Sequence, residues 1–226
     1  MSRRPVILIT SALAGSMASQ RDHIYSLRRN YADAVAELGG LPLILPYQRA
    51  TIDEALNLCD GVVVSGSNPG EIVARDRLDY ERALIAAAIA RERPLLGICH
   101  GMQLIGQVLG GSIVSIDGLN TIKTDDELHF PYEVPDQLAH AIDITDGSRL
   151  KALLGVDRIM VNSFHRHELK GPGDFTVAAR SPADGVIEVI ESKTRALCLG
   201  LQWHPEFLVT QEDQVILKHF VDTCRK

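Results

Sequence analysis

Short apolar runs alternate with helical patterns through the first half of the chain, and this alternation limits the fold most strongly. Each run typical of a buried strand is followed by a segment with apolar residues at helical spacing, as in Leu27, Tyr31 and Leu38. A strand–helix repeat of this kind predicts a mostly parallel sheet with helices on both faces. The pattern predicts strands at 6–10, 41–45, 61–65 and 94–98 and helices at 25–38, 51–58, 76–91 and 101–109.

The pattern changes after Gly111, where strand-like runs follow one another. It predicts a small antiparallel region in the C-terminal half, with a final helix at 211–223 that Thr210 caps. The polar, aperiodic segment 117–137 is predicted to form a long surface loop near the site. Hydrophobic residues make up 46% of the chain, enough to bury a sheet between helices. We therefore expect one flavodoxin-like α/β domain over 1–226. The later strands are predicted at 113–116, 141–145, 158–162, 175–179, 185–190 and 196–202.

The apolar run near the N-terminus allows two interpretations. Arg3 and Arg4 precede the apolar residues 5–14, a pattern that also resembles a short secretory signal. We favour a first β-strand at 6–10, because a strand followed by a helix suits an α/β sheet. No apolar run is long enough to span a bilayer.

The net charge indicates which partners are unsuited to the chain, and the cysteines indicate the redox state of its compartment. The net charge of −6 disfavours nucleic acid and anionic membranes as partners, because both repel an acidic surface. Four cysteines without a Cys-x-x-Cys pair, in a domain too large to need disulfides, fit a reduced, cytoplasmic compartment.

The segment 97–101, Gly-Ile-Cys-His-Gly, joins a predicted buried strand to a predicted helix. It follows the Gly-x-nucleophile-x-Gly pattern, with Cys99 as the nucleophile. Glycines on both sides permit a sharp turn, and a helix N-terminus favours thiolate over thiol. The backbone N–H of His100 could then stabilise an oxyanion. The alternative is a buried structural cysteine, the role we expect for Cys59, Cys198 and Cys224.

The base that a thiol nucleophile needs is predicted at His204, in the segment Gln-Trp-His-Pro-Glu at 202–206. A parallel strand that ends just before His204 would bring it to the same sheet edge as Cys99. Glu206 could orient the imidazole through its second nitrogen. A surface histidine in a loop is the alternative for His204 taken alone.

Together, the motifs at 97–103 and 202–206 resemble those of the class I glutamine amidotransferases, in order and in spacing. Further segments are similar to the γ-glutamyl-γ-aminobutyrate hydrolase (peptidase C26) branch, and the resemblance spans nearly the whole chain. It implies a cysteine hydrolase that cleaves a γ-glutamyl amide to glutamate and an amine, without a cofactor. The segments that carry it include Gly-Gly-Leu-Pro-Leu at 39–43, Val-Asn-Ser-Phe-His at 161–165 and Ala-Arg-Ser-Pro at 179–182.

The resemblance also implies a role for individual residues. Cys99 would be the nucleophile, His204 the base and Glu206 the orienting acid. Gly66 would supply the second oxyanion amide beside that of His100. The segment 65–76 is shorter than is usual in this branch, so the leaving-group pocket is expected to differ in size or shape. The substrate-binding residues that it implies are Gln103 for the glutamyl moiety and Ser163, Phe164 and His165 for the acceptor side.

Other functions stay open at this stage. The same catalytic residues would serve a glutaminase subunit that supplies ammonia to a separate synthase, and a non-catalytic binding protein could share the fold. His165 and His167 could be two metal ligands on one side of a strand. No further cysteine or carboxylate stands at ligand spacing, so we predict no metal site. The expected partner is a small-molecule γ-glutamyl substrate, and exposed apolar strips could support a homodimer.

Overall fold

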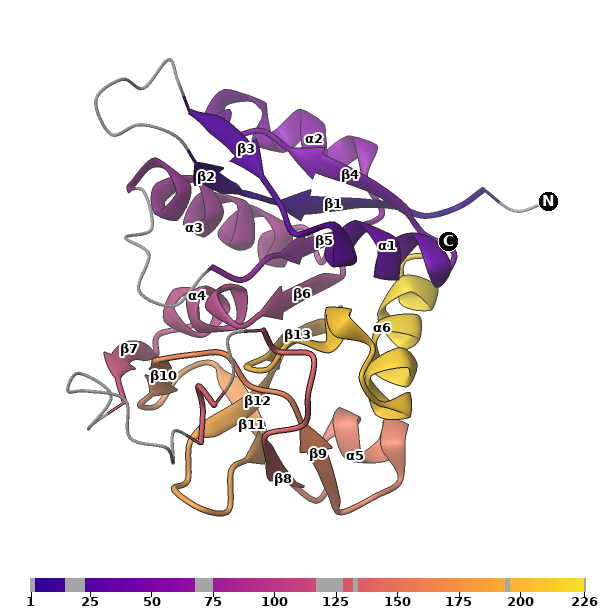
Figure 1. Cartoon of the computed structure of the whole chain (residues 1–226). Helices are drawn as coiled ribbons and strands as arrows, with labels where there is room; N and C mark the ends of the chain where they lie inside the picture. Colours follow the sequence, from indigo (N-terminus) through magenta and orange to yellow (C-terminus); the bar gives the residue numbers. More distant parts are fainter. Residues whose placement is uncertain are drawn as a thin grey trace.

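A nine-stranded sheet forms the centre of the computed structural model, which describes residues 3–14, 23–67, 75–116, 128–131, 134–193 and 196–225. The strands lie in the order β4-β1-β5-β6-β13-β12-β11-β8-β9 (Figure 1). The first five are parallel to one another and the last four are added antiparallel. The sheet is therefore mixed, with one parallel and one antiparallel half.

The parallel half confirms the predicted flavodoxin-like arrangement. Its strands, taken in chain order, lie as 2-1-3-4-5, the order of flavodoxin-like folds. The apolar run near the N-terminus forms the inner strand β1, with parallel neighbours on both sides, which confirms the strand interpretation of that segment. The five strands are β4 (Leu41–Leu45), β1 (Val6–Thr10), β5 (Gly61–Val64), β6 (Leu95–Ile98) and β13 (Cys198–Leu201).

The antiparallel strands predicted for the C-terminal half are confirmed, and four of them continue the same sheet. Two short antiparallel pairs lie apart from it: β7 (Ser112–Ser115) with β10 (His167–Lys170), and β2 (Ala12–Ala14) with β3 (Ile24–Ser26). The antiparallel strands of the main sheet are β12 (Ile187–Ser192), β11 (Phe175–Arg180), β8 (His140–Ile144) and β9 (Arg158–Val161).

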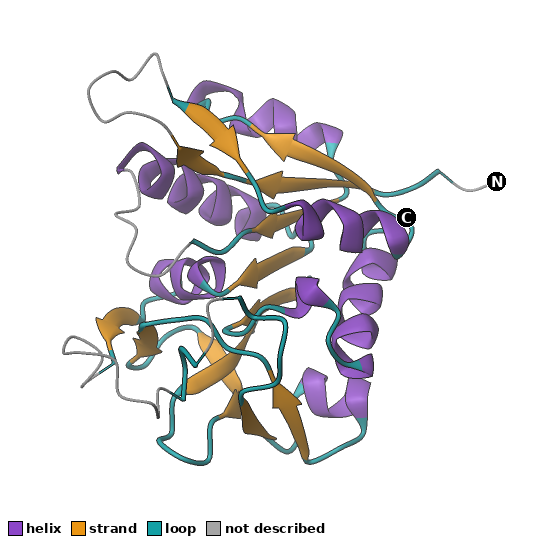
Figure 2. Ribbon diagram, in the orientation of Figure 1, coloured by secondary structure: helices purple, strands orange, loops and turns teal. Residues whose placement is uncertain are grey.

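Helices cover both faces of the sheet, as predicted (Figure 2). One face packs against α1 (Arg29–Glu37), α5 (Arg149–Leu154) and α6 (Gln211–Thr223). The other packs against α2 (Ile52–Leu58), α3 (Arg75–Ala90) and α4 (His100–Val108). The hydrophobic core accordingly forms two clusters, one on each side. Short 3-10 turns, η2 (Arg49–Thr51) and η3 (Pro205–Phe207), precede α2 and follow β13.

Some predicted elements differ from the structure. The helix predicted at 25–38 begins only at Arg29, because Ile24–Ser26 pairs with Ala12–Ala14 as a hairpin. The sequence did not predict α5 or β10. Thr210 is confirmed as the N-cap of α6, where its side chain and that of Asp213 form a capping box. Most of the loop predicted at 117–137 lies outside the described residues.

Candidate active site

Cys99 stands at a sharp turn between β6 and α4. Its backbone has φ 53° and ψ −108°, a left-handed conformation that a residue with a side chain adopts only at a cost of about 1–3 kcal/mol. Its N–H donates to the carbonyl of Leu201 at 2.7 Å, which ties the turn to the end of β13. A strained residue held in this way suggests a functional position.

The two glycines that flank Cys99 are required by close backbone contacts. A Cβ on Gly97 would lie 2.6 Å from the carbonyl carbon of Gly101. A Cβ on Gly101 would lie only 2.0 Å from the carbonyl oxygen of Val64. Neither clash involves a side chain that could rotate away, so glycine is needed at both positions. This agrees with the steric role that the sequence pattern predicted for them.

His204 follows β13 and is held from two directions. Its Nδ1 lies 2.8 Å from Oε1 of Glu206, and both side chains are buried. Its backbone N–H donates to Oδ1 of Asn162 at 2.8 Å, and its carbonyl accepts from Nδ2 of Asn162 at 2.9 Å. Asn162 thus fixes the backbone of His204 while Glu206 orients the ring. The sequence assigned no role to Asn162.

Cys99 and His204 meet at Gly66, which follows β5. A Cβ on Gly66 would lie 3.1 Å from Cε1 of His204 and 3.5 Å from Cβ of Cys99. The structure therefore brings the three residues together from the ends of β5, β6 and β13. Ligands of open α/β sheets bind at this carboxyl edge.

The electrostatics of His204 favour a charged ring. Burial opposes the imidazolium, but the Glu206 carboxylate and the Cys99 sulfur outweigh it and raise the pKa of His204 to about 10. Among the described residues, Nε2 of His204 has no hydrogen-bond partner of ordinary geometry. The Cys99 thiol donates to the carbonyl of Phe164 at 3.8 Å. A protonated His204 beside the Cys99 sulfur can release a proton to a leaving group.

Tyr31 of α1 is a site residue that sequence reasoning missed. The N–H of Gly66 donates to the Tyr31 hydroxyl at 2.9 Å, so the predicted oxyanion amide has a partner within the chain. Burial, the Glu206 carboxylate and the Cys99 sulfur raise the pKa of Tyr31 well above its usual value, so the phenol stays neutral. Tyr31 thus links the Gly66 loop to the residues around His204. Only its position in the helical pattern could be read from the sequence.

We expect Tyr31→Phe to lower kcat about 10-fold with little change in KM. The change removes the hydroxyl that ties the Gly66 N–H to α1, so the predicted oxyanion amide loses its fixed position, and one lost hydrogen bond is worth about 0.5–1.5 kcal/mol. Steady-state kinetics together with thermal unfolding would measure the effect. Tyr80→Phe is the matched control, because that buried hydroxyl has no partner among the described residues. A rise in kcat for Tyr31→Phe would contradict the prediction and identify the hydroxyl as a competitor of the oxyanion.

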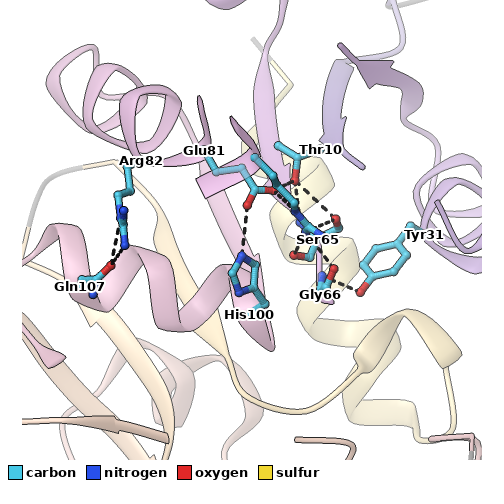
Figure 3. Close-up of polar contacts among 9 residues, drawn as sticks. Thr10, Tyr31, Ser65, Gly66, Glu81, Arg82, His100 and Gln107 are labelled. Carbon is cyan, nitrogen blue, oxygen red and sulfur yellow. Dashed lines mark hydrogen bonds and ion pairs between the residues drawn. The ribbon is translucent and has the colours of Figure 1, made fainter. Parts of the chain in front are cut away.

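A buried ion pair on α3 holds both predicted oxyanion residues (Figure 3). Arg77 donates through Nη2 to the carbonyls of Ser65 and Gly66, at 3.1 and 2.9 Å. Glu81 accepts from Arg77 Nε at 3.0 Å through Oε1, and its Oε2 lies 3.2 Å from the His100 ring. The pKa of Glu81 is lowered, because Arg77 and His100 outweigh the effect of burial. The carboxylate is therefore charged and anchors Gly66 and His100 together.

A pocket of about 240 Å³ opens above this site. Gly66, Tyr31 and His204 form part of its wall. Phe164 lines another side, and the guanidinium carbon of Arg28 lies 5.7 Å from the centre of its ring. The pocket therefore combines a cation, an aromatic surface and the predicted catalytic base.

The predicted substrate-binding residues differ in where their side chains lie. Phe164 lines the pocket. Gln103 is buried, and its Nε2 donates to the carbonyl of His167 at 2.8 Å and to Gln202 Oε1 at 3.1 Å. Ser163 is also buried and donates to the carbonyl of His129 at 2.9 Å. His165 is turned toward other histidines. This geometry does not favour direct substrate contact by Ser163 or His165.

Comparisons with known proteins show which family the chain is similar to. The model of the Peptidase C26 family matches residues 5–206. A γ-glutamyl-γ-aminobutyrate hydrolase of Escherichia coli is 28% identical, over 88% of this chain and 87% of that protein. A glutamine amidotransferase-like protein of Rickettsia prowazekii is 27% identical, over 92% of this chain and 93% of that protein. The solved structure of a glutamine amidotransferase of Thermotoga maritima matches with a TM-score of 0.65 at 16% sequence identity. The match covers 98% of this chain and 96% of that chain. The resemblance inferred from the motifs is thereby confirmed.

Proposed function

Because the chain belongs to the peptidase C26 family, we propose that it cleaves γ-glutamyl amides with Cys99 as nucleophile, His204 as general acid and base, and Glu206 as orienting acid. The observation that carries this proposal is the meeting of Cys99 and His204 at Gly66, with Glu206 2.8 Å from the far nitrogen of the imidazole. A thiol, an imidazole and a carboxylate in this order form the arrangement of cysteine hydrolases.

In the described part of the chain, none of the helices combines the length and apolar character needed to cross a bilayer.

The proposed reaction has two steps. The Cys99 thiolate forms a bond to the γ-carbonyl carbon while His204 gives its Nε2 proton to the leaving nitrogen, and the C–N bond breaks. A water molecule then attacks the thioester, its proton passes to His204, and the C–S bond breaks to release glutamate and restore the thiolate. The N–H of His100, the first residue of α4, has no acceptor within the helix and can stabilise the oxyanion in both steps.

The pocket suggests which leaving group is favoured. Arg28 places a cation on its wall, and Phe164 offers an apolar surface beside it. An amine that carries a short apolar chain and a carboxylate, such as γ-aminobutyrate, complements both. We therefore propose γ-glutamyl amides of ω-amino acids as the preferred substrates.

We expect glutamate release to be fastest from γ-glutamyl-γ-aminobutyrate. Release from the γ-glutamyl amide of an amine without a carboxylate should be at least about 10-fold slower, because the loss of one charge-assisted hydrogen bond of ~1.4 kcal/mol corresponds to that factor. An enzyme-coupled glutamate assay on a panel of amides would measure kcat/KM. The α-linked isomer, which places the scissile bond elsewhere, is the control and should not react. No release from any γ-glutamyl amide would contradict the proposal.

A second function remains for the same residues. The matched relatives include proteins described as glutamine amidotransferase-like, so a glutaminase subunit that passes ammonia to a synthase is the alternative. Glutamine turnover that appears only with a co-purifying partner would favour it over the stand-alone hydrolase.

A further inference from the structure

Three histidines and a glutamate meet in the antiparallel half of the protein, and they are called the histidine cluster here: His129, His140, His165 and Glu188. They come from four separate segments: the stretch 128–131, the start of β8, the turn after β9, and β12. All four side chains are buried, and Glu188 is 0% exposed. One potential ligand atom from each residue lies within 4.8 Å of the others.

The inward-facing atoms of the cluster have no hydrogen-bond partners within the described residues. Oε1 of Glu188 lies 3.5 Å from Nδ1 of His129, 3.7 Å from Nε2 of His140 and 3.9 Å from Nε2 of His165. These contacts are too long for hydrogen bonds. The three histidine nitrogens and both carboxyl oxygens of Glu188 therefore have no partner in the described part of the chain. Five unpaired polar atoms in one buried place require an explanation.

The other nitrogen of each histidine faces an oxygen acceptor. Nε2 of His129 lies 2.7 Å from Oδ2 of Asp184. Nδ1 of His140 faces the carbonyl of Ala141 at 3.2 Å, and Nδ1 of His165 faces that of His167 at 3.0 Å. A carbonyl or carboxylate oxygen accepts a hydrogen, so these outer nitrogens carry the proton of a neutral imidazole. The three inner nitrogens then present lone pairs toward the Glu188 carboxyl group.

Lone pairs that converge on a carboxyl group repel one another unless a proton or a cation lies between them, and one proton on Glu188 can pair with only one of the three nitrogens. We propose that the histidine cluster binds one Zn²⁺ through His129 Nδ1, His140 Nε2, His165 Nε2 and a Glu188 oxygen. A tetrahedral zinc with bonds of about 2.0–2.1 Å separates its ligand atoms by about 3.4 Å. The three contacts of Glu188 Oε1 need to contract by only a few tenths of an ångström, whereas the histidine nitrogens, which lie within 4.8 Å of one another, approach by up to about 1.4 Å when the metal binds. The outer acceptors match the usual partners of metal-bound histidines.

The donor set and its burial point to a structural site. Four protein ligands fill a tetrahedral zinc and leave no open position for a substrate. The ligands also connect segments that border the pocket: His165 follows Phe164 in the chain, and its N–H donates to the carbonyl of His129 at 2.8 Å. The carbonyl of Glu188 accepts from the N–H of Gln202, two residues before His204. Zinc would thus hold the Phe164 wall against the sheet.

No spacing pattern in the sequence could reveal these ligands, because they are scattered over four segments. The pair that the sequence suggested, His165 and His167, is separated in the structure: His165 belongs to the cluster, whereas the side chain of His167 is exposed. His167 contributes only its backbone carbonyl, as the acceptor for Nδ1 of His165.

Metal analysis of the untagged full-length chain tests the proposal. We expect about one equivalent of zinc per chain by inductively coupled plasma mass spectrometry, as for a single closed site. Stripping with a chelator should lower the midpoint of thermal unfolding, and Zn²⁺ should restore it. Co²⁺ added to the stripped protein should give the intense visible bands of a tetrahedral N/O site. The proposal would be overturned if the chain held no zinc and gave no cobalt spectrum at saturating metal.

Variants assign the metal to these residues. Glu188→Gln and His140→Ala should each bring the zinc content to background, whereas His167→Ala, the neighbouring exposed histidine, should retain it. Cys99→Ala should also retain it, which excludes zinc held by the predicted catalytic pair. Unchanged zinc in both folded cluster variants would overturn the assignment. If those variants do not fold, the cobalt spectrum of the unmodified chain decides whether cysteine holds the metal. Cysteine ligation would add a charge-transfer band, which the histidine cluster cannot produce, so that band would overturn the assignment.

Discussion

Cys99→Ala is expected to abolish the hydrolysis of γ-glutamyl amides, with a fall in kcat of about a million-fold, the size seen when a hydrolase loses its nucleophile. No other group at the elbow can form the thioester, because neither the His100 ring, which contacts Glu81, nor the Gly66 amide carries a thiol. A glutamate-release assay at saturating substrate would measure the loss. Intact-mass analysis should find a glutamyl adduct on the unmodified chain and none on the variant.

The control for this prediction is Cys198→Ala. Cys198 lies buried on the neighbouring strand β13, and burial raises the pKa of its thiol to about 12, so it is an inert structural cysteine. Its replacement should leave kcat within about two-fold, since volume changes of this size in a core cost little stability. Substantial turnover by a folded Cys99→Ala protein would refute the nucleophile assignment.

Glu81→Ala is expected to lower the free energy of unfolding by about 3–5 kcal/mol, because it leaves the Arg77 guanidinium buried without its counter-ion. Arg77 is 2% exposed and Glu81 0% exposed, so water cannot replace the lost carboxylate. The variant also frees the His100 ring and the Thr10 hydroxyl, which donates to Glu81 at 2.6 Å. Urea denaturation at neutral pH would measure the change.

Two further proteins make this test specific. Asp33→Ala breaks another pair at the same helical spacing, Arg29 with Asp33, but Arg29 is 89% exposed, so the free energy of unfolding should hardly change. The double variant Arg77→Met with Glu81→Leu should be more stable than Glu81→Ala, because it leaves no buried charge. Its kcat should nevertheless be lower than that of the unmodified chain, since the Gly66 carbonyl loses its donor. A loss below about 1 kcal/mol for Glu81→Ala would contradict the argument.

The sequence predicted the main elements because their patterns are local. Apolar runs and helical spacing are repeated within a few residues, so β4, the final helix α6 and its Thr210 cap were placed correctly. The hairpin of β2 and β3 was missed because its strands have three residues each and are largely exposed. The helix α5 has only six residues, too few to display a helical period.

The sequence by itself determined which residues are the candidates for the chemistry, and the tertiary structure decided how these candidates are supported. Cys99, His204 and Glu206 could be predicted because each lies in a short motif whose glycines or proline limit the backbone. Their supports could not, because Tyr31, Asn162 and the Arg77–Glu81 pair reach the site through contacts between segments far apart in the chain. The histidine cluster is the extreme case, with four potential ligands from four segments. A motif specifies local geometry, whereas burial, pairing and charge balance depend on which segments the sheet brings together.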